Sequence, residues 1–143
     1  MKQEEPQPIE LVATDRLRPI EGHSRKRVRW LVEKITRESL WTRPLCVERN
    51  HLLVLDGMHR LHAALEMGLA VVPCALFDYD EVEVWSLRDN HVVTRERVVE
   101  QATAGTIYPY KTAKHRFPGV IAPLSIPVDS LRPSPRAAGE CAP

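Results

Sequence analysis

The sequence predicts an α+β fold: a single compact domain in which a small mixed sheet is flanked by helices. Short apolar stretches with the length of strands alternate along the chain with amphipathic stretches that have the period of helices. A chain of 143 residues is long enough for one domain with its own hydrophobic core. We expect this domain to span residues 1–132. Residues 133–143 are rich in Pro, Ala and Gly and are expected to form a disordered tail.

The composition is that of an ordinary globular protein, with 43% hydrophobic and 27% charged residues. A formal net charge of +1 gives no general reason to expect binding to nucleic acid or to a membrane. Because no apolar run approaches the length of a membrane span and residues 1–6 are too polar for a signal peptide, we expect a cytoplasmic protein. Cys46 and Cys74 lie in strand-like runs and are expected to be buried, Cys141 lies in the polar tail, and no zinc-binding spacing is present.

The first part of the chain carries a strand signal and then a helix signal. Residues 9–13 are a predicted strand, followed by a turn-rich segment over 14–19. Ser24 is a suitable N-cap for a helix over residues 25–39. The apolar face of this helix consists of Val28, Leu31, Val32 and Ile35. The opposite face carries Arg25, Lys26, Arg29, Glu33, Lys34 and Arg37. A basic helix face of this kind is usually solvated.

The central part predicts a hairpin and a second helix. Residues 45–48 and 52–55 are strand-like runs separated by a short polar turn. A helix is expected from Gly57 to about Met67, with Gly68 in the position that helix C-caps favour. Its residues at core spacing are Met58, Leu61, Ala64 and Leu65. A further strand is expected over residues 71–77.

The last part carries weaker signals. Alternation around Trp85 predicts a half-exposed strand, and Thr94 is a suitable cap for a helix over residues 94–104. The interior positions of that helix are Val98, Val99 and Ala102. Residues 108–118 are expected to form a loop dense in cations and hydrogen-bond donors. Residues 120–128 are expected to form an edge strand, because their prolines cannot donate to a central ladder.

The segment 53–60 has the pattern of a phosphate site: a buried strand breaks at an Asp-Gly turn and runs directly into a helix. A helix start has unpaired N–H groups and partial positive charge, and Gly57 allows close approach of the backbone. His59 and Arg60 add donors, and Asp56 adds a carboxylate that could hold a metal or accept a proton. The alternative is purely structural, since Asp-Gly is a common turn and Asp is a good helix cap. The His-Arg pair directly after the turn favours the phosphate site.

Phosphoryl transfer needs cations or a metal on the phosphates and an acid to orient the nucleophile. Glu21, in the segment after Pro19, and Asp56 are the candidate acids, and magnesium commonly binds through one or two carboxylates and substrate phosphates. Lys114 and His115 are candidates to hold an anionic group of the substrate. The structural alternative is that Glu21 and Lys114 are ordinary surface charges.

Several motifs together resemble the ParB/sulfiredoxin fold superfamily, from about Ile9 to Phe77. They are the Leu-Arg-Pro turn ending at Pro19, the helix after it, the segment 53–60 and the pair Ala63-Ala64. Sulfiredoxins have a reactive cysteine at the position of Met58, which cannot act as a thiolate. Partition ParB proteins have a Gly-Glu-Arg-Arg box and a helix-turn-helix domain, neither of which we expect here.

The chain is most similar to the free L-serine kinase branch of this superfamily. That branch has an acid after the Leu-Arg-Pro turn, an Asp-Gly-x-His-Arg turn, and a later Lys-Ser/Thr-x-Arg-His element, matched here by residues 111–115 with Lys114 in place of the arginine. The resemblance implies a kinase that converts L-serine to O-phospho-L-serine with ATP or ADP and Mg²⁺. It implies Glu21 and Asp56 as the catalytic acids, which would also be the metal ligands. The implied nucleotide-binding residues are Gly57, Met58, His59 and Arg60. The implied substrate-binding residues are Thr112, Lys114 and His115, with Trp85 as a further candidate.

The resemblance leaves several alternatives open: ADP or ATP as donor, serine or a close hydroxy-amino acid as acceptor, and either acid as the base. The expected partners are a nucleotide and a small amino acid, without nucleic acid or membrane, and the oligomeric state is open. A second hypothesis is a ParB-like regulator that binds nucleotide or DNA and has no kinase activity. The basic face of the helix over residues 25–37 is its main support.

Overall fold

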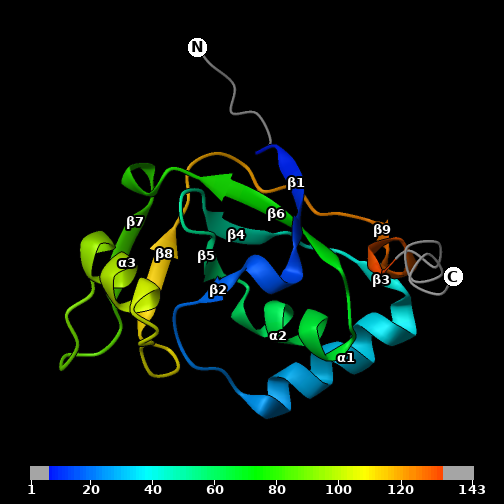
Figure 1. Ribbon diagram of the computed structural model, residues 1–143, viewed down its shortest axis with the longest axis horizontal. Coiled ribbons are helices and arrows are strands. Elements are labelled where there is room, and N and C mark those ends of the chain that lie inside the picture. The colour runs from blue at the N-terminus through cyan, green and yellow to red at the C-terminus, as the bar shows by residue number, and fades with distance from the viewer. Residues whose placement is uncertain (1–6, 134–143) are drawn as a thin grey trace, which may run out of the picture.

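A computed structural model describes residues 7–133 of the chain. Its centre is a five-stranded mixed sheet (Figure 1). In spatial order the strands are β1 (Ile9–Ala13), β6 (Val71–Phe77), β4 (Leu45–Glu48), β5 (Leu53–Asp56) and β2 (Arg18–Pro19). The pairs β1–β6 and β4–β5 are antiparallel, whereas β4–β6 and β2–β5 are parallel. The predicted α+β class with a mixed sheet is therefore confirmed.

Helices α1 (Arg25–Glu38) and α2 (Met58–Glu66) pack against each other on one side of the sheet (Figure 1). The predicted cap is confirmed, since Ser24 Oγ accepts the Arg27 N–H at 3.2 Å. The predicted apolar stripes are buried in both helices except for Val32, which is partly buried, and Leu65. Leu65 was expected in the core but is 48% exposed, because the chain turns after the helix and Leu69 takes up the buried position at that end.

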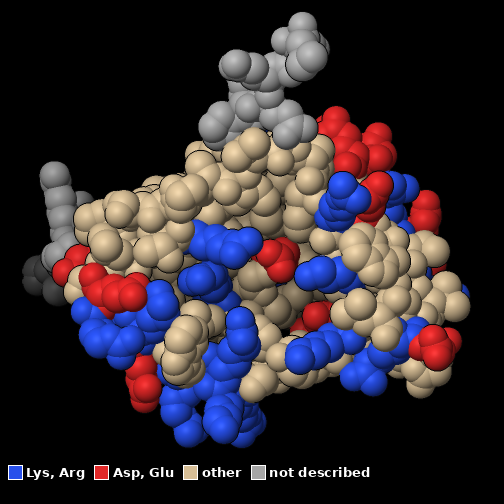
Figure 2. All heavy atoms as spheres, turned by 180° about the vertical axis from the view of Figure 1, so that it is seen from behind, with Lys and Arg blue, Asp and Glu red and all other residues tan. Residues whose placement is uncertain are grey.

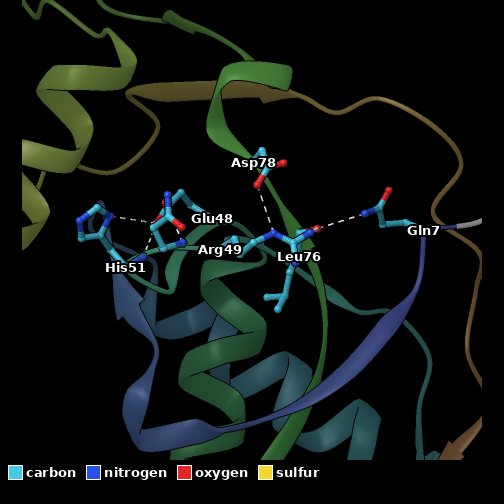
Figure 3. Close-up of polar contacts among 7 residues, drawn as sticks. Gln7, Glu48, Arg49, His51, Leu76 and Asp78 are labelled. Carbon is cyan, nitrogen blue, oxygen red and sulfur yellow. Dashed lines mark hydrogen bonds and ion pairs between the residues drawn. The ribbon is translucent and has the colours of Figure 1, made fainter.

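The turn between β4 and β5 is held by a buried carboxylate at the far end of the sheet (Figure 3). Glu48 is 2% exposed and accepts the backbone N–H groups of Asn50 at 2.9 Å and His51 at 2.7 Å. These two hydrogen bonds close a tight turn in which Leu52 adopts a positive φ of 57°. The predicted hairpin is confirmed, and a carboxylate rather than glycine stabilises its turn.

A second unit lies beside the sheet and contains β7 (Glu83–Ser86), α3 (Arg95–Thr103) and β8 (Ala113–Arg116) (Figure 1). The prediction that residues 108–118 form only a loop was wrong, because β8 pairs antiparallel with β7. Ala113 and His115 face inward and are buried, while the charged residues between and after them are exposed. This short alternation has few apolar residues, so its strand character is hidden in the sequence.

The end of the chain also differs from expectation. The predicted edge strand over residues 120–128 is reduced to β9 (Ile126–Pro127), which pairs with β3 (Leu40–Trp41). Prolines at 123 and 127 remove ladder donors, so only a short pairing remains. The chain then forms a 3-10 turn over Val128–Leu131. The expected disordered tail, 133–143, lies outside the described residues except for Pro133.

The core supports the predictions made for the cysteines in the sheet. Cys46 and Cys74 are both buried free thiols, and burial raises the pKa of each to about 12. These two thiols are therefore protonated at neutral pH and behave as small apolar side chains. Within residues 7–133, the helices are all too short or too polar to cross a membrane.

Candidate functional site

The strand–turn–helix segment has the geometry that its sequence predicted. Strand β5 ends at Asp56, Gly57 is the N-cap of α2 with φ 101° and ψ 26°, and the helix begins at Met58. A Cβ atom at Gly57 would lie 2.6 Å from Leu45 Cδ2, so both the backbone angle and the close packing require glycine. Asp56 is exposed and does not cap the helix. The explanation of Asp56 as a helix cap is therefore wrong, and Asp56 leaves the first N–H groups of α2 available to another acceptor.

A cavity of about 610 Å³ opens at this helix start, within the usual size range of small-molecule sites. It brings together all three segments that the sequence analysis singled out. The predicted site residues in its wall are Glu21, Asp56, Gly57, Met58, His59, Arg60, Lys114 and His115. The cavity lies between α1 and β8, with the start of α2 between them.

Glu21 reaches this cavity because its segment pairs with the loop before β8. The N–H of Gly22 donates to the Tyr108 carbonyl at 2.9 Å, and the N–H of Tyr108 donates to the Ile20 carbonyl at 3.0 Å. Glu21 Oε2 then accepts the backbone N–H groups of Thr112 at 3.1 Å and Ala113 at 2.9 Å.

Burial raises the pKa of the Glu21 carboxyl, against the opposing effect of these backbone hydrogen bonds. A carboxylate with a raised pKa that is fixed in position is suited to accept a proton at neutral pH.

Two of the predicted substrate-binding residues do not line the cavity. The Thr112 side chain is fully buried, and its hydroxyl donates to the Pro109 carbonyl at 2.6 Å, so Thr112 meets the site through its backbone N–H to Glu21. Trp85 is 42% exposed and lies opposite Lys114 in the β7–β8 pair. Direct contact of these two side chains with a substrate stays a prediction.

His115 is held deep in the wall on the β8 side. It is 8% exposed, and its Nε2 atom lies 2.8 Å from the Tyr79 hydroxyl. Burial, with a smaller effect of Lys114, lowers the pKa of His115 to about 4. The imidazole is therefore neutral at physiological pH. Its Nδ1 atom is buried without a hydrogen-bond partner among the described residues.

His59 links the phosphate-binding turn to the first helix. Its Nε2 atom accepts the backbone N–H of Ser24 at 3.1 Å, which requires a neutral ring at that nitrogen. Burial, together with Arg27 and the neighbouring histidines, lowers the pKa of His59 and favours this neutral form. The rings of His23 and His62 stack beside it with centroids 3.7 Å apart. His62 therefore has a packing role next to the site.

The α1 side of the cavity contains residues that the site predictions missed. It is lined by Arg27, Trp30 and Lys34 on one face of α1 and by Arg43 before β4. Figure 2 shows Lys and Arg side chains gathered around a hollow on this face of the molecule. Burial and the charges of Arg43 and Arg27 lower the pKa of Arg60. The i, i+3, i+7 spacing of Arg27, Trp30 and Lys34 is a signal in the sequence that could have identified this wall.

The acidic side chains of the cavity determine which metal ion it could hold. No cluster of three His, Cys, Asp or Glu side chains that could hold a metal occurs within residues 7–133. Mg²⁺ does not require such a cluster, because it is usually held by one or two carboxylates and by substrate phosphates. Asp56 is exposed in the cavity wall and fits that role, whereas Glu21 already accepts two backbone hydrogen bonds through one oxygen.

Comparison with known proteins places the fold among relatives of known structure. No protein-family profile matches the chain. A ParB-like protein from Sulfolobus acidocaldarius is 32% identical over 85 residues, which are 59% of this chain and 42% of that protein. This chain therefore matches less than half the length of that relative.

Solved structures resemble most of the chain. A free serine kinase in complex with AMP has a TM-score of 0.81 at 14% identity, covering 90% of this chain and 95% of that chain. SbnI with a C-terminal truncation, from Staphylococcus aureus, has a TM-score of 0.80 at 11% identity, covering 93% and 92%. The predicted resemblance to the ParB/sulfiredoxin fold, and to its free serine kinase branch, is confirmed at the level of the fold.

Proposed function

We propose that this protein is a small-molecule kinase that transfers the terminal phosphoryl group of ATP or ADP to the hydroxyl of free L-serine or a close hydroxy-amino acid. The observation that carries the proposal is the meeting of two carboxylates, Glu21 and Asp56, with a cation-rich helix start in one cavity. The fold shared with free serine kinases also supports the proposed kinase function.

In this proposal the nucleotide phosphates bind at the start of α2. The N–H groups of Met58 and His59 and the guanidinium of Arg60 would contact the phosphate oxygens, which favour a helix N-terminus. Asp56 would hold Mg²⁺ together with those oxygens. The bound ion would neutralise charge on the transferring phosphoryl group.

Glu21 is the proposed general base. The substrate hydroxyl oxygen attacks the terminal phosphorus, the bond from that phosphorus to the bridging oxygen of the nucleotide breaks, and the hydroxyl proton passes to Glu21. Its raised pKa and its fixed Oε2 atom support this assignment over Asp56, which is exposed. Lys114 and the neutral imidazole of His115 lie on the same side as Glu21 and would hold the carboxylate of the amino acid.

The proposal is tested by ³¹P NMR of the purified protein with Mg²⁺ and L-serine, with ADP or ATP in separate samples. We expect a phosphoserine signal with one of the two donors. The signal should be lost in Asp56→Asn, because an amide binds Mg²⁺ poorly. Asp78→Asn is the matched control, since Asp78 is also an exposed acid but pairs with Arg49 at 3.2 Å away from the cavity (Figure 3).

A negative result would have a defined meaning. No product with serine, threonine or homoserine would contradict the kinase proposal. If the same protein bound DNA in a salt-sensitive manner, the cations over α1 would instead support the ParB-like regulator without kinase activity.

A further inference from the structure

Trp30 presents its indole ring in the wall of the cavity and is 52% exposed. Trp41, in contrast, is fully buried in the core. A large aromatic side chain in a polar cavity leaves apolar area in contact with water, which is unfavourable unless a ligand covers it. Truncation of Trp30 would leave the core face of α1 intact, because that face consists of Val28, Leu31 and Ile35.

The surroundings of Trp30 define the ligand that would cover it. Arg27 and Lys34 each lie about one helical turn from Trp30, on either side of it, and Arg43 also lines the cavity. The acids that line the cavity, Glu21 and Asp56, belong to other segments. Lys34 pairs with Glu38 at 3.0 Å, so this wall offers one flat apolar surface beside the cations Arg27 and Arg43. A planar ring attached to an anionic chain satisfies both features.

We propose that Trp30 is the stacking platform for the nucleobase of the phosphate donor. The inference rests on the proposed kinase function and adds the position of the base to it. The base lies against the indole, the phosphates pass Arg43 and Arg60, and the terminal phosphate reaches the start of α2. The hydroxyl substrate then occupies the opposite side of the cavity, next to Glu21. Because stacking uses the face of a base rather than its edge, the site should accept different purines with similar affinity.

The test compares nucleotides with a phosphate chain that has no base. Binding of ATP, ADP and inorganic tripolyphosphate is measured by calorimetry for the wild-type protein and for Trp30→Ala. Loss of stacking should weaken nucleotide binding roughly tenfold to a hundredfold. The affinity for tripolyphosphate should stay unchanged, because the phosphate contacts remain. Trp30→Phe should recover most of the nucleotide affinity. Arg29→Ala, an exposed residue of α1 outside the cavity wall, is the control.

A spectroscopic readout supports the same test. Nucleotide should quench tryptophan fluorescence in the wild-type protein, and the quenching should disappear in Trp30→Phe although Trp41 and Trp85 remain.

Equal effects of Trp30→Ala on the affinities for nucleotide and for tripolyphosphate, or no effect on either affinity, would overturn the nucleobase platform and leave the kinase proposal standing. Failure of the wild-type protein to bind nucleotide or tripolyphosphate would overturn both. If Trp30→Ala weakened the binding of a short single-stranded oligonucleotide but not the binding of ATP or ADP, Trp30 would be part of a nucleic-acid site and the inference would be wrong.

Discussion

The two sides of the cavity meet at the start of α2 and differ in how their polar groups are held. On the β8 side, Glu21 accepts two backbone N–H groups and His115 is buried against Tyr79. On the α1 side, Arg27 and Trp30 are exposed. The β8 side is thus organised before any ligand arrives, whereas the α1 side leaves its charge and apolar area to be covered by one. We therefore expect the rate of the chemical step to depend on the β8 side and ligand affinity to depend on the α1 side.

The largest expected effect is on turnover and comes from the β8 side. Glu21→Gln keeps an oxygen that can accept the Thr112 and Ala113 N–H groups but removes the base. We expect kcat for serine to fall by about 10²–10⁴-fold, with little change in melting temperature. Steady-state kinetics and thermal unfolding measure the two quantities. Glu33→Gln, an exposed acid of α1 outside the cavity, should behave as wild type. If the kcat of Glu21→Gln stayed within tenfold of the wild-type value, the chemical step would not depend on the β8 side as proposed.

The second prediction concerns the pH dependence of stability, and it comes from His115. The pKa of this histidine is about 4 in the folded protein and has its ordinary value of 6.5 in the unfolded chain. Between these values the unfolded state binds a proton that the folded state does not, so the free energy of unfolding falls as the pH decreases from about 6.5 to 4. The total loss is about 3 kcal/mol.

Urea unfolding at a series of pH values, for the wild-type protein and for His115→Phe, isolates this contribution. The raised pKa of Glu21 acts in the opposite direction and is present in both proteins, so the difference between the two curves reports His115. Parallel curves would show that His115 titrates normally and that the β8 side is more hydrated than its burial indicates.

The contrast between the two sides was only partly predictable from the sequence. Caps such as Ser24 and apolar periodicity identified the helices and the central strands, because those signals are local. The meeting of Glu21 with residues 111–115 depends on the pairing of residues 20–22 with Tyr108, a contact distant in sequence that no local pattern encodes. Strand β8 has few apolar residues to reveal it. The spacing of Arg27, Trp30 and Lys34 indicates one shared face of α1, but only the structure shows that this face borders the cavity.

A smaller effect is expected at Gly57, where the two sides share the start of α2. Gly57→Ala places a side chain at φ 101° and within 2.6 Å of the buried Leu45, and should lower the free energy of unfolding by about 1–3 kcal/mol. Gly68→Ala is the matched control, because Gly68 has φ 68° and no atom within 4 Å of the added Cβ. It should cost about 1 kcal/mol from the backbone angle alone. Equal losses in chemical unfolding would mean that Leu45 moves aside and that Gly57 is needed only for its angle.

The smallest expected effect tests how the β8 side holds its neutral histidine. Tyr79→Phe removes the hydroxyl next to His115 Nε2 and should cost about 1 kcal/mol of stability. Where the hydroxyl donates to Nε2, it stabilises the neutral ring, and its removal should then also raise the pKa of His115, as measured by ¹⁵N NMR of the imidazole. Tyr108→Phe is the control, since its hydroxyl donates to the Val92 carbonyl at 2.9 Å and lies outside this pair. An unchanged His115 pKa in Tyr79→Phe would mean that burial alone keeps the ring neutral, and the β8 side would then be organised by packing rather than by its hydrogen bonds.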